Sequence, residues 1–124
     1  MDPERIESLV PMAYVADIDA SAAFYERLGF EVCARFAPPG EDRPSWVSLR
    51  SGGAELMLAR ASEPVVAREQ AVLFYVYCRD VAAIRGRLAE AGLDPGPIAK
   101  PFYNPEGEFR LVDPDGYVVM VAHL

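Results

Sequence analysis

The sequence predicts an α+β fold made of two similar halves, each with the order strand, helix, strand, strand, strand. Each half has an apolar run of strand length, then an aspartate that can begin a helix and, twelve residues later, a glycine that can end it. The landmarks of the first half recur 63 residues later, because Asp17 is matched by Asp80 and Gly53 by Gly116. A repeat kept in register in this way indicates two copies of one unit. Each unit covers one face of its sheet with its helix and leaves the other face for a partner or a ligand.

The first half begins with an apolar strand at Leu9–Val15. The helix that follows extends to Gly29, and either Asp17 or Asp19 can accept hydrogen bonds from its first amide groups. Gly29 can adopt the left-handed backbone conformation that commonly follows the last turn of a helix. The residues that share one helical face, and that we expect to be buried, are Ser21, Phe24, Tyr25 and Leu28.

Three further strands are expected in the first half. The first is Phe30–Phe36, and a loop rich in proline and charge follows it at Ala37–Pro44. The other two, Ser45–Leu49 and Ala54–Ala59, are joined by the segment Arg50–Gly53. Two adjacent glycines between strand-like runs are typical of a hairpin.

The second half repeats the pattern. Its first strand is the aromatic-rich run Ala71–Cys78, and its helix extends from Asp80 to Gly92. The helical face expected to be buried consists of Val81, Ile84, Leu88 and Ala91. A stretch rich in proline and glycine, Asp94–Gly107, then leads to a last hairpin. The strands of this hairpin are Glu108–Val112 and Tyr117–Ala122.

These elements predict a single domain over residues 1–124. We expect a first module at about 7–60, a linker at 61–70 and a second module at about 71–124. Pro64 disfavours a long helix in the linker, because proline cannot donate a helical hydrogen bond.

The composition excludes several classes of function. The chain has 19 acidic and 12 basic residues, a net charge of −7, and none of the basic clusters that contact nucleic-acid phosphates. No apolar run approaches the roughly 20 residues of a membrane span. The first residues, Met1–Arg5, lack the layout of a secretory signal. We therefore expect a cytoplasmic protein with neither nucleic-acid nor membrane partners.

Cysteine and histidine are scarce. Cys33 and Cys78 lie in apolar strand-like runs, and without a secretory signal we expect them to be free, buried thiols. The single histidine, His123, is the penultimate residue. No serine or cysteine nucleophile with a histidine base is therefore visible.

Two motifs carry a resemblance to a known family. The first is Val15–Asp19 continuing into Ala23–Phe30, and the second is Val112–Gly116 (VDPDG). With these motifs the chain, from about Glu7 to Ala122, resembles the vicinal oxygen chelate superfamily, and in particular its glyoxalase and bleomycin-resistance-like members. The resemblance implies two βαβββ modules that form a curved mixed sheet around a cavity, and it implies a homodimer.

The resemblance also implies where a divalent metal would bind in the enzymes of the superfamily. Those positions are occupied here by Val10, Leu73, Met120 and either Met57 or, if the turn is read differently, Glu55. A catalytic metal needs about three protein ligands, and this set offers at most one carboxylate. We therefore expect neither a metal nor another cofactor, and no catalytic residues.

Alternation along the strands predicts the residues of the inward face, if Val10 and Leu73 mark it. That face contains Met12, Tyr14, Glu55, Met57, Tyr75, Tyr77, Val118, Met120 and Ala122. Alternation does not settle the face of Trp46, the only tryptophan, whereas Phe102 and Tyr103 lie in a loop where aromatic side chains can contact a ligand. The residues expected to bind a ligand are Tyr14, Trp46, Glu55, Tyr75, Tyr77, Phe102, Tyr103 and Met120. Ordinary packing or a solvated strand position is the alternative for each.

The leading functional hypothesis is a metal-free small-molecule-binding protein that resembles bleomycin-resistance proteins. It would sequester a drug-like ligand, either cationic and aromatic or flat and neutral, in an aromatic cleft. The alternative is a glyoxalase-like lyase or isomerase, or a dioxygenase, with an atypical metal site. A third possibility is a dimeric interaction module whose cavity is filled by side chains.

Overall fold

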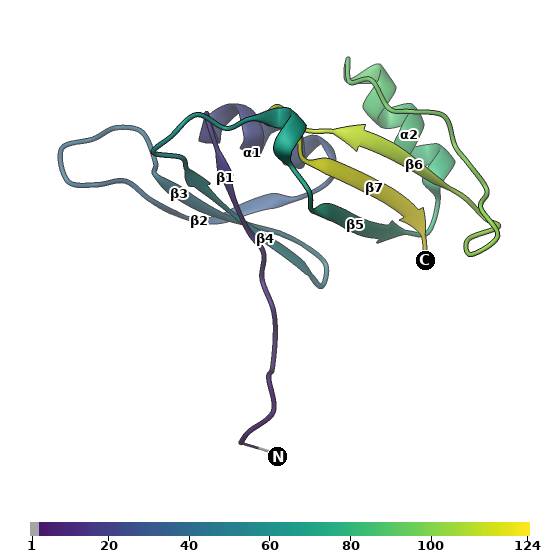
Figure 1. Cartoon of the computed structure of the whole chain (residues 1–124), viewed down its shortest axis with the longest axis horizontal. Helices are drawn as coiled ribbons and strands as arrows, with labels where there is room; N and C mark the ends of the chain where they lie inside the picture. The colour runs from purple at the N-terminus through teal and green to yellow at the C-terminus, as the bar shows by residue number, and fades with distance from the viewer. Residues whose placement is uncertain (1–2) are drawn as a thin grey trace.

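The computed structural model describes residues 3–124, and its strands form two mixed sheets. The first half contains β1 (Met12–Val15), α1 (Ile18–Arg27), β2 (Glu31–Phe36), β3 (Trp46–Ser51) and β4 (Ala54–Arg60). Its sheet has the order β1-β4-β3-β2, in which β1 is parallel to β4 and the other pairs are antiparallel. This first sheet lies to the left in Figure 1, with α1 against it.

The second half forms the second sheet. A short 3₁₀ helix at Ala67–Glu69 in the linker precedes β5 (Leu73–Cys78), α2 (Val81–Glu90), β6 (Glu108–Val112) and β7 (Val118–His123). The order is β5-β7-β6, with β5 parallel to β7 and β6 antiparallel to it (Figure 1). Helix α2 packs on β6 and β7.

The α+β prediction and the repeated order of elements are confirmed, with one strand fewer in the second half. The proline-rich segment that takes the place of that strand follows β6 through only a few hydrogen bonds. The Gly96 amide donates to the Arg110 carbonyl (2.8 Å), and Ala99 and Glu108 exchange two bonds (2.8 and 2.9 Å). Pro95, Pro97 and Pro101 supply no amide hydrogen, so a continuous ladder cannot form.

Both helices begin at the predicted aspartates. The Asp17 side chain accepts a hydrogen bond from the Ala20 amide (3.2 Å), and the Asp80 side chain accepts one from the Ala83 amide (3.0 Å). The predicted buried face of α1 is confirmed. On α2, Val81 and Leu88 are buried and Ile84 is half-buried, but Ala91 is exposed because the helix ends at Glu90.

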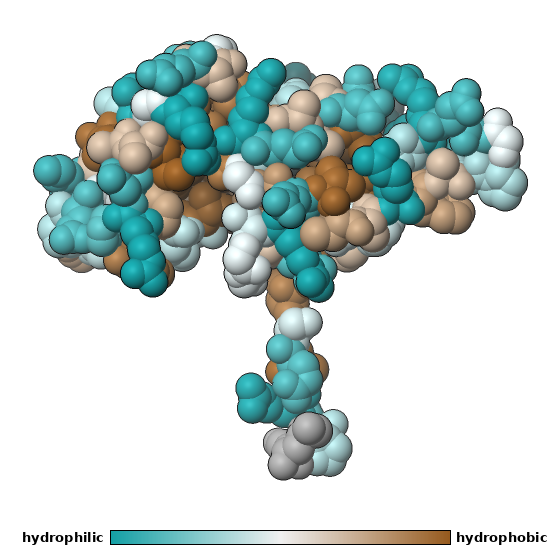
Figure 2. Space-filling model, turned by 180° about the vertical axis from the view of Figure 1, so that it is seen from behind, coloured by the Kyte–Doolittle hydropathy of each residue, from teal (hydrophilic) through white to brown (hydrophobic). Residues whose placement is uncertain are grey.

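The first strand is shorter than the sequence suggested. It begins at Met12 instead of Leu9, and the Met57 amide of β4 still donates a hydrogen bond to the Pro11 carbonyl just before it (2.9 Å). Residues 3–11 extend away from the body of the chain, as Figures 1 and 2 both show. Ile6 and Leu9 on this arm are more than 80% exposed (83% and 87%).

A buried hydrogen-bond network joins the two halves. Asp113 and Asp115 lie in the turn between β6 and β7, yet their carboxylates contact the first half. Asp113 Oδ2 accepts from the Tyr25 hydroxyl (2.7 Å), while Asp115 accepts from the Ala16 amide (2.9 Å) and the Ser21 hydroxyl (3.2 Å). Buried apolar residues of both halves form one continuous core around this junction.

The cysteines are free, as expected, but neither is buried. Cys33 is exposed and Cys78 is half-buried. Cys33 lies at a register shift between Val32 and Ala34 on β2, which is the edge strand of its sheet, so one side of that strand lacks a neighbour. No helix within residues 3–124 is long and apolar enough to cross a membrane.

Candidate ligand-binding site

The face of the first sheet that points away from α1 carries an aromatic group. In the strand register, Tyr14 pairs with Ala59 and Ala59 with Trp46, so all three lie on the same face. This places Trp46, half-buried on β3, beside Tyr14, which is 56% exposed on β1. The opposite residues, Ala13 and Val15, are buried in the core, so the predicted alternation holds here. We call this surface the aromatic face of the first sheet.

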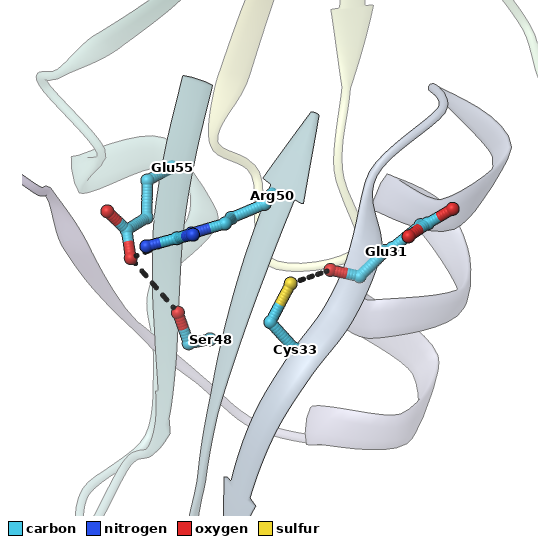
Figure 3. Close-up of polar contacts among 5 residues, drawn as sticks. All are labelled: Glu31, Cys33, Ser48, Arg50 and Glu55. Atoms are coloured by element: carbon cyan, nitrogen blue, oxygen red, sulfur yellow. Dashed lines mark hydrogen bonds and ion pairs between the residues drawn. The ribbon is translucent and has the colours of Figure 1, made fainter. Parts of the chain in front are cut away.

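Glu55 lies on the same face, but its carboxylate already has two partners. Oε1 lies 3.5 Å from the Arg50 Nε atom and 3.5 Å from the Ser48 hydroxyl, and Figure 3 shows the Glu55 carboxylate directed toward both side chains. Cys33 and Glu31 lie on the far side of β3 from Glu55, on β2 (Figure 3). Glu55 therefore presents a carboxylate that already has two partners within the sheet.

The second sheet has a corresponding aromatic face, formed by Tyr75, Tyr77 and Met120. Tyr75 pairs with Met120 in the register of β5 and β7, which puts them on one face. The rings of Tyr75 and Tyr77 are stacked, with centroids 6.1 Å apart and planes inclined by 27°. Both tyrosines are exposed (41% and 60%), whereas Val119 and Val121 on the other face are buried.

The loop before β6 adds two more aromatic residues. Phe102 is 96% exposed, and its ring contacts that of Tyr103 edge to face at 5.4 Å. The Tyr103 hydroxyl donates a hydrogen bond to Glu108 Oε1 at 2.6 Å. This bond to Glu108 is the main cause that raises the pKa of Tyr103. A side-chain hydrogen-bond interaction with Tyr75 raises it further, so the phenol stays protonated.

Glu108 is a residue that sequence reasoning missed. It is only 4% exposed, and its Oε2 atom is the one buried side-chain polar atom among residues 3–124 without a hydrogen-bond partner. It pairs with Ala122 across β6 and β7, so it lies on the aromatic face of the second sheet. Carrying the alternation across the last hairpin from Met120 to its partner strand would have placed Glu108 on this face, but it would not have shown that the residue is buried.

Five of the eight predicted ligand residues border three hollows. A groove of about 460 Å³ between the sheets is lined by Glu55 and Tyr75. A pocket of about 380 Å³ at the end of β5 and β7 is lined by Tyr75, Tyr77, Tyr103 and Glu108. Tyr14 lines a third hollow of about 500 Å³ beside the linker. Tyr75 thus borders both the groove and the second pocket, while Trp46, Phe102 and Met120 lie outside all three.

The residues at the family metal positions do not fit a divalent cation. Leu73 and Met120 lie on the aromatic face of the second sheet, and neither offers an oxygen or nitrogen ligand. Glu55, the single carboxylate of the set, is paired with Arg50. No group of three or more His, Cys, Asp or Glu residues within residues 3–124 is arranged to hold a metal ion. We therefore derive no chemistry through a metal.

Comparisons with known proteins identify one family and several similar structures. The family model of the Glyoxalase/Bleomycin resistance protein/Dioxygenase superfamily matches residues 5–121. A bleomycin-binding protein solved in complex with bleomycin shares 21% identity and a TM-score of 0.77, over 96% of this chain and 99% of that one. No curated protein matches the chain.

Two further solved structures have the same fold. The bleomycin resistance determinant encoded on the transposon Tn5 shares 24% identity, with a TM-score of 0.68, over 95% of this chain and 98% of that one. TnmS3, an antibiotic binding protein from Streptomyces sp. CB03234, shares 22% identity, with a TM-score of 0.72, over 98% of each chain. At these identities the likeness establishes the fold, and the function has to be argued from the site.

Proposed function

The chain belongs to the Glyoxalase/Bleomycin resistance protein/Dioxygenase superfamily, and we propose that it is a metal-free protein that sequesters a drug-like small molecule. The observation that carries the proposal is the row of exposed tyrosines on the strands. Tyr75 and Tyr77 face outward next to a groove and a pocket, while every second residue beside them packs inward. Small-molecule sites are concave and mostly apolar, with a few placed polar groups.

The ligand class follows from the chemistry of these faces. Stacked phenol rings, one indole and thioether side chains suit a flat, aromatic molecule. The net charge of −7 favours the approach of a cation. Similar structures include proteins described as binding bleomycin or an antibiotic, which supports a ligand of this kind.

We also propose that the protein is a homodimer in which a second copy helps to cover the aromatic faces. Met12, Tyr14, Leu73 and Tyr77 are each between 43% and 60% exposed, and exposed apolar surface of this extent marks an interaction site. The arm adds further apolar side chains that a single chain leaves uncovered. Light scattering should give about 27 kDa, twice the chain mass of 13.6 kDa. A species of about 14 kDa would contradict the homodimer.

Titration of Trp46 fluorescence with bleomycin tests the proposed function. We expect saturable quenching without added metal, and about a tenfold weaker affinity for Tyr75→Ala, since the aromatic side chain borders both hollows. The control is Arg27→Ala on the exposed side of α1, which should bind as the wild type does. No heat of binding in a calorimetric titration with bleomycin, with or without added metal, would contradict the proposal for this compound. Binding that requires Zn²⁺ or Mn²⁺ would instead favour the enzyme alternative.

A further inference from the structure

The pocket at the end of the second sheet contains a carboxyl group with one oxygen unused. Glu108 Oε1 accepts the Tyr103 hydroxyl, but Oε2 has no partner although the residue is 96% buried, that is 4% exposed. Burying a carboxylate without a full set of partners costs free energy unless a donor or a countercharge is supplied. A buried acceptor of this kind next to a hollow is the feature expected of a ligand-binding group.

The chain does not supply the missing countercharge. None of the ion pairs among residues 3–124 includes Glu108. His123, on the same pocket, places its Nδ1 atom 2.7 Å from Glu106. Arg110 shares the sheet face with Glu108, but it is exposed and forms no ion pair with it. A positive charge at Glu108 would therefore come from a ligand.

The Glu108 oxygen without a partner, Oε2, can accept a hydrogen bond from an ammonium group. An ammonium is a compact charge that can donate to Oε2 alone. The stacked rings of Tyr75 and Tyr77 border the same pocket and offer π-faces, which attract a cation of this size.

Tyr103, which is hydrogen-bonded to Oε1, is the exposed partner of the Glu108 carboxyl group. This residue is 61% exposed, while the loop below it is held by the Asn104 side-chain amide, which donates to the His123 carbonyl (3.1 Å). Rotation of the Tyr103 side chain would break its hydrogen bond to Glu108, while the hydrogen bond from Asn104 to His123 would still hold the loop. The phenol is thus a hydrogen-bond partner of the carboxyl group that can move away from it.

We propose that Glu108 anchors a protonated aliphatic amine of the ligand, and that Tyr103 is hydrogen-bonded to this carboxylate until the amine replaces its hydroxyl. This inference rests on the proposed ligand-binding function and specifies its polar subsite. It assigns charge recognition to Glu108 instead of Glu55, whose carboxylate is held by Arg50.

The test compares 4-phenylbutylamine with its uncharged N-acetyl derivative, using ¹H–¹⁵N NMR of the full chain. We expect the amine to bind about 10-fold to 100-fold more tightly than the amide, because a hydrogen bond to a charged group is lost in the latter. Amide signals of Glu108, Tyr103 and Tyr75 should shift. Equal affinity for the two compounds, or no shift at Glu108 with the amine, would overturn the subsite. Bleomycin binding measured in parallel reports on the proposed function separately.

Three variants complete the test. Glu108→Gln keeps the shape and an acceptor for Tyr103, and it should abolish the preference for the amine. The matched control is Glu106→Gln, which removes a carboxylate from the same pocket and should keep that preference. Tyr103→Phe removes the competing hydroxyl and retains the ring, so the amine should bind more tightly. Weaker binding of the amine to Tyr103→Phe would overturn the role of Tyr103 as a competing partner.

Discussion

The turn between β6 and β7 and the start of β6 both bury carboxyl groups, and the two regions differ in how those groups are satisfied. Both oxygens of Asp113 accept hydrogen bonds, Oδ2 from Tyr25 (2.7 Å) and Oδ1 from the Asp115 and Tyr117 amides (2.9 Å each). Both oxygens of Asp115 also accept hydrogen bonds. Glu108, five residues before Asp113, is as buried but has one oxygen without a partner.

This difference separates a structural role from a binding role. A buried carboxylate whose donors all come from the chain stabilises one arrangement of the two halves. A buried carboxylate with an unmet acceptor weakens the folded state slightly and leaves interaction energy for a ligand. Asp113 and Glu108 look alike in the sequence, because each is an acidic residue next to an apolar strand run.

The largest expected loss of stability follows from replacing Asp113, whose two carboxylate oxygens both have hydrogen-bond partners. Asp113→Ala leaves the Tyr25 hydroxyl and two backbone amides without their acceptor, so it should lower the free energy of unfolding by about 3 kcal/mol or more. Glu108→Gln should change it by less than about 1 kcal/mol. Urea denaturation of both variants measures the difference. A Glu108→Gln variant destabilised as much as Asp113→Ala would remove the contrast between the two regions.

The same turn makes a close contact that can be tested at a glycine. Gly116 has φ of +87°, and a Cβ atom there would lie 2.5 Å from the Cβ of Ala67 in the linker. Gly116→Ala should therefore cost about 2–3 kcal/mol, from backbone strain and this clash. Gly52→Ala also has a positive φ (+56°) but open space around it, so we expect about 1 kcal/mol. Thermal unfolding of the two variants isolates the effect of the contact with Ala67. Equal losses of stability in the two variants would show that this contact is unimportant.

The pH dependence of stability sharpens the account of Asp113. Burial raises the pKa of this carboxyl above its usual 3.8, and its hydrogen bonds only partly oppose the shift. A raised pKa means that the folded state binds the proton more tightly than the unfolded state. The contribution of Asp113 to the unfolding free energy is therefore most favourable below pH 3.8 and falls as the pH rises through its folded pKa. In urea titrations, the stability difference between wild type and Asp113→Asn should shrink from acidic to neutral pH, and a growing difference would reverse this assignment.

The smallest effect is expected at Glu55. Its pair with Arg50 has side chains that are 62% (Arg50) and 32% (Glu55) exposed, and ion pairs near the surface contribute little. Glu55→Gln should lower the free energy of unfolding by no more than about 0.5 kcal/mol. Chemical denaturation at low and high salt checks this value. A loss above about 1 kcal/mol would mean that Glu55, and not only Asp113, belongs to the structural framework.

Much of the framework could be predicted from the residues. Helix starts at Asp17 and Asp80 follow from capping, and the division of β1 and β5 into two faces follows from alternation, because both signals are local. The face of Trp46 could not be predicted, since it depends on the pairing of β3 with β4 and β1. The importance of Glu108 was hidden for the same reason, because its burial requires the pairing of β6 with β7 and the fold of the preceding loop.

The sequence by itself determined where both helices begin, which residues of β1 and β5 share a face, and that the metal positions of the family lack suitable ligands. These properties follow from the order of side chains along one strand or helix. Only the tertiary structure decided which acids find hydrogen-bond or ion-pair partners. Asp113 meets Tyr25 from 88 residues away, Glu55 meets Arg50 across a hairpin, and Glu108 is left with a free oxygen. Partners of this kind are brought together by packing between elements, so no local pattern in the chain records them.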